Sequence, residues 1–412
     1  MYFRQPQYFK NFYCIGDKCG DNCCYGWRIN WTKEELDKLK NAPNCSDELK
    51  ELIEKSFAPS QTTEGEYDIV FNSFGKCPCV TEEGLCRIQK ELGAEYLSNT
   101  CMIYPRHYYL AGETMYRHCN MSCREAFRLM ISDEKAMDLV NIPIKQKLSI
   151  KGVFMHDSDK IAARPELGYS GDLFEFFYEI IGDKKRDVET SIILGALAAQ
   201  KLVQIIDNKE YDLIPEALKS FRQQFHNGAQ LKAIENIKPN YRAKLAVPGE
   251  FLGHIESRNV MSSLVDSTGK LNIDLYLQGE RRLDDTYKDR PYYLRNIALN
   301  LLLEFAMPFK FENKTLFENY SLFAASYAIF KLNAIAVSEF TQRKEESQSS
   351  VSAGNRIKIN VNFKVNTDSY VCKSCAFVSR ALCHSDNNAL KLIEHLKKHN
   401  ITTPAYLALL VK

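Results

Sequence analysis

The sequence of 412 residues lacks any long basic or acidic block, and its 54 lysines and arginines nearly balance its 52 aspartates and glutamates. Because phosphate-rich partners bind basic surfaces, the composition gives no support for nucleic acid or for a membrane as a partner. The sequence also lacks an apolar run of about 18 residues, the length of a membrane span. Its start, MYFRQPQYFKNFYC, shows no cationic segment followed by an apolar one. We therefore expect a cytoplasmic protein.

Cysteine is absent between Cys123 and Cys372, although the chain has 14 cysteines. Most of them fall in the first 123 residues, beginning with the stretch CIGDKCGDNCC. In a reducing compartment, closely spaced cysteines are more often metal or cluster ligands than disulfides. Thiolates select zinc, copper(I) or iron–sulfur clusters, and the spacing lacks the paired C-x2-C knuckles of a zinc ribbon. The alternative is that these cysteines are buried small hydrophobic residues.

The hydrophobic pattern predicts a mainly α fold: an N-terminal cysteine-rich, cluster-binding domain packed on a helical body, with a small C-terminal segment. We expect the domains at 1–130, 131–345 and 346–412. The body contains three apolar helical stretches, of which the last two should pack as neighbours: DVETSIILGALAAQKLVQIIDN, RNIALNLLLEFAMPF and ENYSLFAASYAIFKLNAIAVSEF. In the first, one broad stripe is expected to be buried: Ile192, Ile193, Ala196, Leu197, Leu202, Val203 and Ile206.

Shorter elements are expected at both ends of the chain. Residues 1–130 should alternate short helices with loops, and Thr32 with Glu35 forms a capping-box pattern at one helix start. The Ser-rich run RKEESQSSVSAGNR, residues 343–356, is typical of a linker. After it the pattern predicts a strand at IKINVNFKV, in a small C-terminal α/β element, and a final helix at NNALKLIEHLKKHN.

Three cysteine-containing segments, in the same order along the chain, resemble the flagellin lysine N-methylase family: CIGDKCGDNCCYGWRI, CPCVTEEGLCRIQKELGAEYLSNTCMIYPR and SCREAFRLM. The stretches RNIALNLLLEFAMPF and ITTPAYLALLVK extend the resemblance through the chain. It implies a bacterial enzyme that transfers methyl groups from S-adenosylmethionine to lysine side chains of flagellin. It also implies an iron–sulfur cluster of the 4Fe-4S type bound by the N-terminal cysteines, with zinc as the alternative metal.

Eight cysteines match the family pattern, and four of them are expected to bind the metal: Cys14, Cys19, Cys23, Cys24, Cys77, Cys86, Cys101 and Cys123. The sequence departs from the pattern at Cys79, where an aromatic residue is usual, and in SCREA, which lacks a proline after the last cysteine. Both departures leave the eight matching thiols intact. Cys45, Cys79 and Cys119 lie outside the pattern, and we interpret them as ordinary cysteines.

Methyl transfer to lysine needs a neutral amine, although the free side chain has a pKa of about 10.4. Catalytic candidates beside the cysteine motifs are Tyr104, Arg106 and Tyr108. Arg106 and Trp27 are candidates for binding S-adenosylmethionine, since a guanidinium binds a carboxylate and an aromatic ring stacks on a sulfonium. Packing over the metal centre and a structural ion pair are the alternatives for these residues. No G-x-G motif follows a strand, and the C-x3-C-x2-C triplet of radical S-adenosylmethionine enzymes is missing.

Two further possibilities stay open in the sequence. A second candidate zinc set lies near the C-terminus, where two histidines are one helical turn apart: Cys372, Cys375, Cys383, His384, His395 and His399. The alternative function is a non-enzymatic adaptor or chaperone, containing a metal or a cluster, that binds flagellin or another protein in the apolar groove of a helical bundle.

Overall fold

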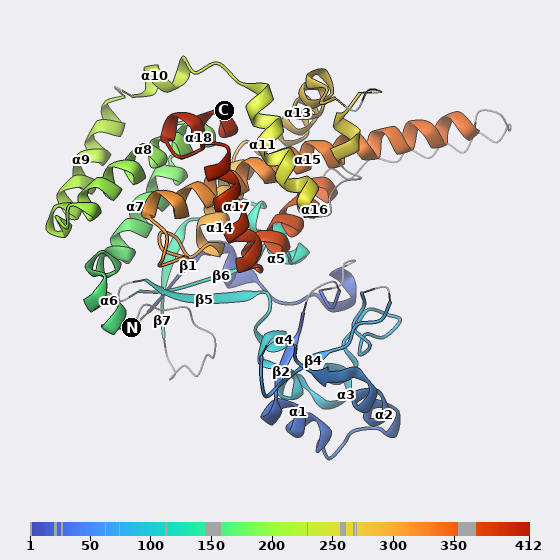
Figure 1. The fold of residues 1–412 in the computed structure, drawn as a ribbon. Coiled ribbons are helices and arrows are strands. Elements are labelled where there is room, and N and C mark those ends of the chain that lie inside the picture. Colours follow the sequence, from blue (N-terminus) through green and yellow to red (C-terminus); the bar gives the residue numbers. More distant parts are fainter. Residues whose placement is uncertain are drawn as a thin grey trace.

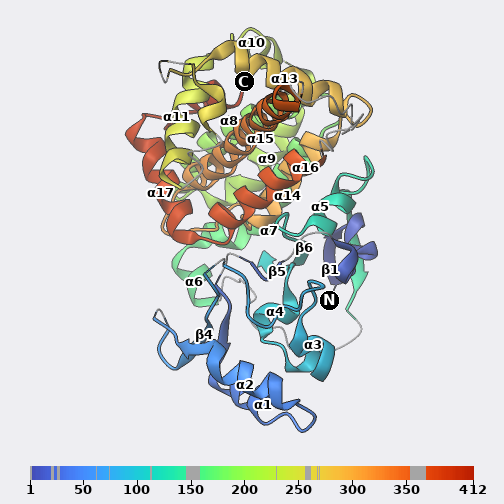
Figure 2. The same ribbon diagram turned by 90° about the vertical axis from the view of Figure 1, so that its right-hand side faces the viewer.

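The computed structural model describes residues 2–412 except 20–22, 26–27, 62, 74, 112–113, 145–157, 229, 256–260, 267, 269 and 353–367. Over the described residues the chain is mainly helical with two small sheets, so the predicted mainly α class is confirmed. Figures 1 and 2 show a small lobe, residues 29–103, beside a larger helical body. The two parts have separate apolar cores.

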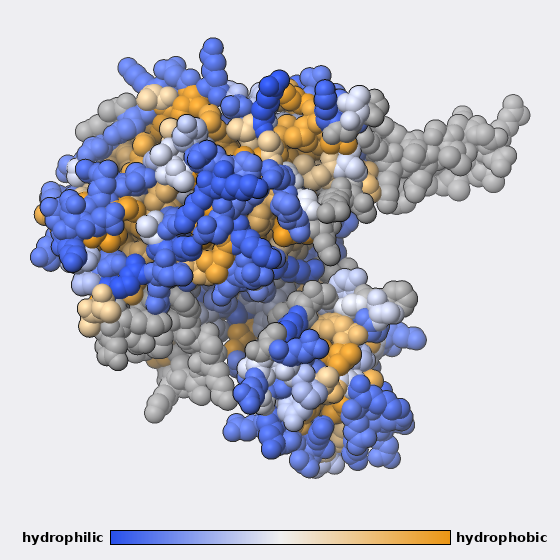
Figure 3. Space-filling model, in the orientation of Figure 1, coloured by the Kyte–Doolittle hydropathy of each residue, from blue (hydrophilic) through white to orange (hydrophobic). Residues whose placement is uncertain are grey.

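The helical body is built around two long central helices, α8 (Val188–Asp207) and α15 (Leu316–Ser352). The other helices of the body are α6 (Ser158–Ala163), α7 (Ser170–Gly182), α9 (Ile214–Asn227), α10 (Leu231–Glu235), α11 (Tyr241–His254), α13 (Ile273–Tyr287), α14 (Tyr293–Glu304), α16 (Asp368–Val378), α17 (Asp386–Lys398) and α18 (Pro404–Val411). Helices α14 and α15 pack as neighbours, as predicted. The face of the body in Figure 3 is largely hydrophilic, with scattered apolar residues.

Helix α8 begins at the N-cap Asp187, whose carboxylate accepts a hydrogen bond from Thr190 N (2.7 Å). Most of its predicted stripe is buried or half-buried, but Leu197 is 37% exposed because the stripe is narrower than expected. Helix α8 and the Leu316–Gln342 part of α15 have the length and apolar composition of membrane spans, yet 61% and 89% of their apolar windows are buried inside the fold. Such burial is typical of the central helices of a helical core.

A four-stranded sheet lies against α7 and α14, in the strand order β5 (Arg106–Ala111), β6 (Thr114–Cys119), β1 (Tyr2–Pro6) and β7 (Leu139–Pro143). Strand β1 is parallel to β6 and antiparallel to β7, while β5 and β6 form a hairpin. The expectation of only short helices and loops before residue 130 was therefore wrong. These strands have no more than six residues each, too few for the alternating pattern to stand out.

The small lobe combines a second sheet with short helices: β2 (Asn30–Thr32), α1 (Lys33–Lys40), α2 (Asp47–Ser56), β3 (Phe57–Pro59), β4 (Glu66–Ile69), α3 (Arg87–Leu92) and α4 (Asn99–Ile103). The predicted capping box is confirmed, because Glu35 N donates to Thr32 Oγ1 (3.2 Å) and Thr32 N donates to the Glu35 carboxylate (3.0 Å). Leu36, Leu39 and Leu49 fill the lobe's core.

Two expectations for the last part of the chain have different outcomes. The first part of the Ser-rich run is helical, since α15 continues to Ser352, and the linker interpretation was wrong there. Good helix formers such as the RKEES segment extend a helix that the core has already nucleated. The strand expected at 357–365 lies outside the described residues. The helix predicted at NNALKLIEHLKKHN is confirmed as α17, but it is not the final one, since α18 follows it.

We expect Gly195→Ala to destabilise the protein by about 1–3 kcal/mol, because the new methyl group would overlap the buried hydroxyl and ring of Tyr320. That hydroxyl cannot move freely, since it donates to Ile192 O at 2.8 Å. The matched control is Gly253→Ala on α11, where the added methyl group would meet no atom of another described element within 4 Å. Urea unfolding midpoints of the two variants measure the difference, and equal midpoints would contradict this packing account.

Candidate functional site

Four of the eight predicted cysteines, Cys24, Cys77, Cys86 and Cys101, pack in or against the core of the small lobe, together with Cys79, while Cys23 is exposed beside them. The backbone N–H of Cys77 donates to Cys24 O (2.9 Å), and Val80 forms an isolated bridge with Cys86, so three separate segments are folded onto each other. We call this set the thiol group, because its members influence each other's pKa electrostatically: Cys23, Cys24, Cys77, Cys79, Cys86 and Cys101.

Sequence reasoning missed Cys79, which is buried and shares a hydrogen bond with Cys77. The Cys79 thiol donates to Cys77, which lowers the pKa of Cys77 and raises the pKa of Cys79. The C-x-C spacing of the two residues was the available signal. Burial raises the pKa of Cys101 to about 12. A bound cation would offset the cost of burying such thiolates, since coordination deprotonates a thiol.

Two of the thiols lie at helix N-termini, where backbone N–H groups point at sulfur. Burial raises the pKa of Cys86, the N-cap of α3, and the N–H groups of Gln89 and Ile88 oppose that rise. Cys123 is the N-cap of α5 (Arg124–Met130), and burial raises its pKa to about 12, although the nearby backbone N–H groups of Ala126 and Glu125 lower it. Such N–H donors and the helix dipole favour the thiolate form, which is the form that binds metals.

Cys123 connects the thiol group to the body. Its charge interacts with Cys19 and with Cys23, a member of the thiol group. Cys14 is exposed, and in the described residues no contact places it with the others. Tyr104, the C-cap of α4, lies beside both Cys123 and Cys23, and burial raises its pKa so that the phenol stays protonated.

A chain of hydrogen bonds leads from Tyr104 into the helical body. The Tyr104 hydroxyl lies 3.0 Å from Ser122 Oγ, which lies 3.3 Å from His384 Nε2. That nitrogen is also 3.2 Å from Ser379 Oγ, which donates to Glu304 Oε2 at 2.7 Å. We call these five residues the polar chain. It joins the edge of the thiol group to a buried carboxylate.

Local structure explains how the polar chain is held. A π-helix, Ser379–Cys383, follows α16, and His384 N donates to Ser379 O across it (3.0 Å). Such widened turns are frequent at functional sites because they displace a side chain from the regular helical face. On the other side, Asn120 N donates to Pro105 O (2.8 Å), which ties the loop carrying Ser122 to the loop carrying Tyr104.

Glu304 is the only carboxylate of the polar chain and is 5% exposed. Burial raises its pKa, and the backbone N–H of Met121 (2.5 Å) and the Ser379 hydroxyl oppose that rise. Asn300 Nδ2 also donates to Glu304 Oε1 (3.0 Å). A carboxylate in this setting is partly desolvated but still hydrogen-bonded, which raises its readiness to accept a proton.

Two neutral histidines of the hairpin lie beside the polar chain. His107 and His118 face each other across β5 and β6, with ring centroids 5.3 Å apart. Burial lowers the pKa of His107 to about 4, as it does for His384, and lowers that of His118 well below its usual value. Both ring nitrogens of His118 are buried without a hydrogen-bond partner in the described part of the structure. The polar chain therefore runs beside buried, uncharged imidazoles.

Comparison with known families adds evidence for the helical body. A model described as the FliB lysine N-methylase C-terminal domain matches residues 174–410, more than half of the chain. The chain belongs to the FliB lysine N-methylase family. The predicted family is thus confirmed. Three members of the polar chain lie inside the FliB match: Glu304, Ser379 and His384.

Curated relatives carry related names. Two proteins named lysine-N-methylase, from Salmonella choleraesuis (strain SC-B67) and Salmonella typhimurium (strain LT2), are each 23% identical over 279 residues. The match covers 66% of this chain and 65% of each relative. The flagellar biosynthetic protein FliU of Salmonella muenchen is 27% identical over 137 residues, which is 33% of this chain and 80% of FliU. No solved structure matches the chain significantly.

The other sequence candidates of this FliB family member are not part of the polar chain. Arg106 and Tyr108 are on β5, where the Arg106 guanidinium lies 5.1 Å from the Phe12 ring and Tyr108 is paired with Arg117. Their alternation with His107 places them on the opposite face of the sheet from it. Trp27 lies outside the described residues. The roles predicted for these three residues stay predictions.

The structure divides the second candidate zinc set of the FliB chain into separate places. Cys372 and Cys375 are buried in α16, within the core of the body. Cys383 shares a hydrogen bond with Glu304, and His384 belongs to the polar chain. The remaining residues, His395 and His399, lie together on α17 and at its C-cap.

Proposed function

We propose that this protein is a cytoplasmic S-adenosylmethionine-dependent enzyme that N-methylates lysine side chains of flagellin. The observation that carries the proposal is the match of residues 174–410 to the lysine N-methylase family. The names of the relatives, two lysine-N-methylases and a flagellar biosynthetic protein, support lysine as the target residue and flagellin as the target protein. The polar chain supplies what the reaction requires, a route for a proton away from a lysine amine.

In the proposed reaction, the lysine nitrogen forms a bond to the methyl carbon of S-adenosylmethionine. The carbon–sulfur bond breaks, and its electron pair stays on sulfur in the departing S-adenosylhomocysteine. The lysine ammonium must lose one proton for its nitrogen to attack. We propose that the Tyr104 hydroxyl accepts this proton from the lysine. At the same time, Tyr104 passes its own hydroxyl proton to Ser122 and so toward the rest of the polar chain. Glu304, the carboxylate at the far end, then holds the proton.

We also propose that the small lobe and the loop before it bind an iron–sulfur cluster through members of the thiol group. In a tetrahedral zinc site with Zn–S bonds of about 2.3 Å, sulfurs lie about 3.8 Å apart. Among the described residues, no three cysteine sulfurs form a group within 4.8 Å. A cubane cluster accepts wider spacing because each thiolate binds a different iron, so these residues fit a cluster better than a single zinc. When bound, the cluster would hold thiols such as Cys77, Cys86 and Cys101 as thiolates and would join their separate segments through its irons.

The test uses protein purified without oxygen, flagellin from the same organism and S-adenosylmethionine labelled in its methyl group. We expect label in flagellin lysines, found by mass spectrometry of the digest. Tyr104→Phe removes the first hydroxyl of the polar chain and should lower kcat about 100-fold with little change in KM for S-adenosylmethionine. Tyr406→Phe, on an exposed tyrosine of α18, is the matched control and should keep full activity.

The outcomes separate the enzyme from its alternative. Binding of flagellin without any transfer of label, under conditions in which a lysine-N-methylase of the same family is active, would support an adaptor and overturn the proposal. Full activity of Tyr104→Phe with labelled lysines would leave the reaction in place but remove the polar chain from it.

A further inference from the structure

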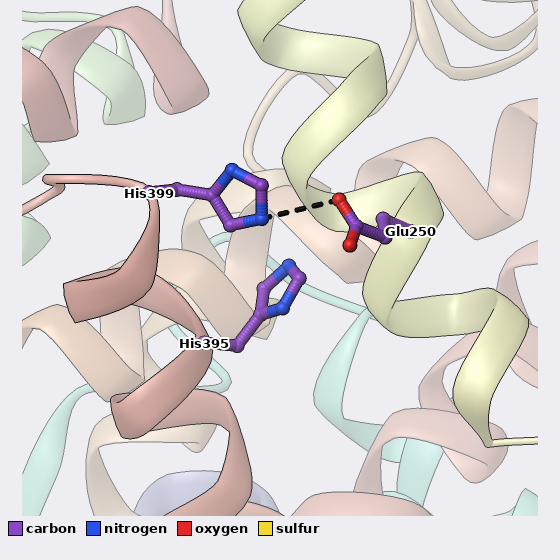
Figure 4. Close-up of side chains that lie close together, drawn as sticks. All are labelled: Glu250, His395 and His399. Atoms are coloured by element: carbon purple, nitrogen blue, oxygen red, sulfur yellow. Dashed lines mark ion pairs between the residues drawn. The ribbon is translucent and has the colours of Figure 1, made fainter.

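A side-chain cluster far from the thiol group lies where α11 meets α17. Figure 4 shows Glu250 on α11 facing His395 on α17 and His399 at the C-cap of α17. One possible ligand atom from each of the three residues lies within 4.8 Å of the other two. The two histidines are one helical turn apart, and their ring centroids are separated by 4.5 Å.

The contacts of this cluster differ from those of an ordinary surface ion pair. His399 Nε2 lies 3.1 Å from Glu250 Oε2. The same nitrogen is buried and makes no hydrogen bond among the described residues, so the two atoms face each other without the alignment of donor and acceptor. Two ligands of one cation have this relation, since both direct lone pairs at the ion instead of at each other.

The backbone of α11 fixes the second histidine. His395 Nε2 lies 3.0 Å from Val247 O, and because a carbonyl oxygen only accepts, this nitrogen carries the hydrogen. A nitrogen that carries this hydrogen cannot bind an ion, so His395 would bind through Nδ1, as metal-binding histidines commonly do when their other ring nitrogen donates to a backbone carbonyl. The His395 ring also packs on Phe251, at a centroid distance of 5.6 Å. The ring is therefore held at the junction of the two helices before any ion binds.

A fourth candidate ligand lies on α11. His254 follows Glu250 by one helical turn, and its ring centroid is 6.4 Å from that of His395. Each helix thus contributes a pair of residues at i and i+4 spacing: Glu250 with His254, and His395 with His399. Three imidazoles and one carboxylate form a ligand set typical of zinc.

We propose that Glu250, His395 and His399, with His254 or water as the fourth ligand, form a zinc site that clamps α17 to α11. The site contains no cysteine and is separate from the thiol group. Ligand atoms in tetrahedral zinc sites with nitrogen ligands lie about 3.4 Å apart, so atoms that are here within 4.8 Å of one another need to approach by up to about 1.4 Å. Glu250 and His399 have room for that movement, since their side chains are 44% and 29% exposed. The bound ion would stabilise the junction of α11 and α17. Through the helices that pack on these two, it would also stabilise this end of the helical body.

Cobalt(II) is the probe that distinguishes this site from the thiols. The full chain, with its cluster in place and treated with a chelator, is titrated anaerobically with Co²⁺. Nitrogen and oxygen ligands give only visible d–d bands, whereas cysteine ligands add sulfur-to-metal charge-transfer bands in the near ultraviolet. We expect about one Co²⁺ per chain with visible bands alone, displaced by Zn²⁺. The double variant H395A/H399A should lose this signal, and Glu250→Gln should weaken binding at least about tenfold.

His226→Ala is the matched control, because this histidine is exposed on α9 and belongs to no such cluster in the described residues. It should bind Co²⁺ as the unchanged protein does. The unfolding temperature gives a second measurement: Zn²⁺ should raise it in the unchanged protein and in His226→Ala, but not in Glu250→Gln, which keeps the shape of the side chain. Equal cobalt spectra and equal zinc-dependent shifts in all variants would overturn the proposal.

Discussion

Cys77→Ser is expected to remove most of the iron and sulfide of the proposed cluster, and the proposed methyl transfer with them. Cys77 is buried at the centre of the thiol group: its sulfur accepts from Cys79, and its charge acts on Cys24, Cys86 and Cys101. A serine hydroxyl keeps the size of the side chain but stays protonated at neutral pH, so it is a poor iron ligand. Loss of a residue that only hydrogen-bonds to a metal ligand lowers metal affinity about 10- to 100-fold, so loss of a ligand itself should lower it by about as much or more.

Cys45→Ser is the matched control for this experiment. Cys45 is also buried in the core of the small lobe, but among the described contacts it lies near Lys50 and Glu91 and outside the thiol group. Both variants should fold, as judged by circular dichroism, and only Cys77→Ser should lose iron and acid-labile sulfide per chain. Retention of both in Cys77→Ser would exclude this residue as a ligand. If the unchanged protein contains zinc but no acid-labile sulfide, the metal bound by these cysteines is a structural zinc and not an iron–sulfur cluster.

The second large effect concerns stability. Lys331→Met should lower the free energy of unfolding by about 3 kcal/mol, because it removes the cation from an ion-pair cluster whose side chains are only 14–20% exposed. Lys331 Nζ lies 3.1 Å from a carboxylate oxygen of Glu189 and 3.1 Å from one of Glu280. The Tyr327 hydroxyl donates to the same Glu189 oxygen (2.8 Å). Without Lys331, two carboxylates from α8 and α13 would face each other in the interior with one partner fewer.

The effect of Lys331→Met should depend on pH with a definite sign. Burial works against the ionised carboxylate of Glu189, but Lys331 and Tyr327 outweigh it, so its pKa is lowered from the usual value of 4.5. That contribution to stability is present above pH 4.5 and is lost as the pH falls through the lowered pKa. The charges of Glu189 and Glu280 raise the pKa of Lys331 well above its usual 10.5, despite its burial. The contribution of Lys331 to stability is complete below pH 10.5. The unchanged protein and Lys331→Met should therefore differ most in stability between pH 4.5 and pH 10.5.

Chemical denaturation at pH 7 and at pH 4 measures this difference. The matched control is Lys219→Met, which removes an exposed lysine 4.0 Å from Glu216 and should change stability by less than about 0.5 kcal/mol. A Lys331→Met variant as stable as the control would contradict the prediction. It would mean that Glu189 and Glu280 become protonated without lowering the free energy of unfolding. A difference that grows toward acid pH would reverse the assigned signs.

Much of the helical body could be predicted from the sequence, because its elements carry local signals. Helix α8 has a broad apolar stripe and α17 has an amphipathic pattern, and both are present near the expected bounds. The capping box at Thr32 was visible from two residues three positions apart. Signals of this kind depend on neighbours in the chain, so a single sequence is sufficient to reveal them.

The parts that could not be predicted depend on distant partners. Glu304 appears in the sequence as one acidic residue at the end of an apolar helix, and only the fold places it against Met121, which is 183 positions away. The four-stranded sheet has the same difficulty, since β1 pairs with residues more than a hundred positions later. The cysteines were found because their number and clustering are unusual, yet the membership of Cys79 depended on a turn that brings it back to Cys77.

The position of β1 also has a consequence for synthesis on the ribosome. Strand β1 lies between β6 and β7, and both of these partners come more than a hundred residues later in the chain. Its backbone N–H and C=O groups therefore lack these strand partners until β6 and then β7 have been translated. An unpaired strand is a site of aggregation and of chaperone binding during that interval. Slow translation before residue 143 should thus lower the soluble yield more than slow translation after it.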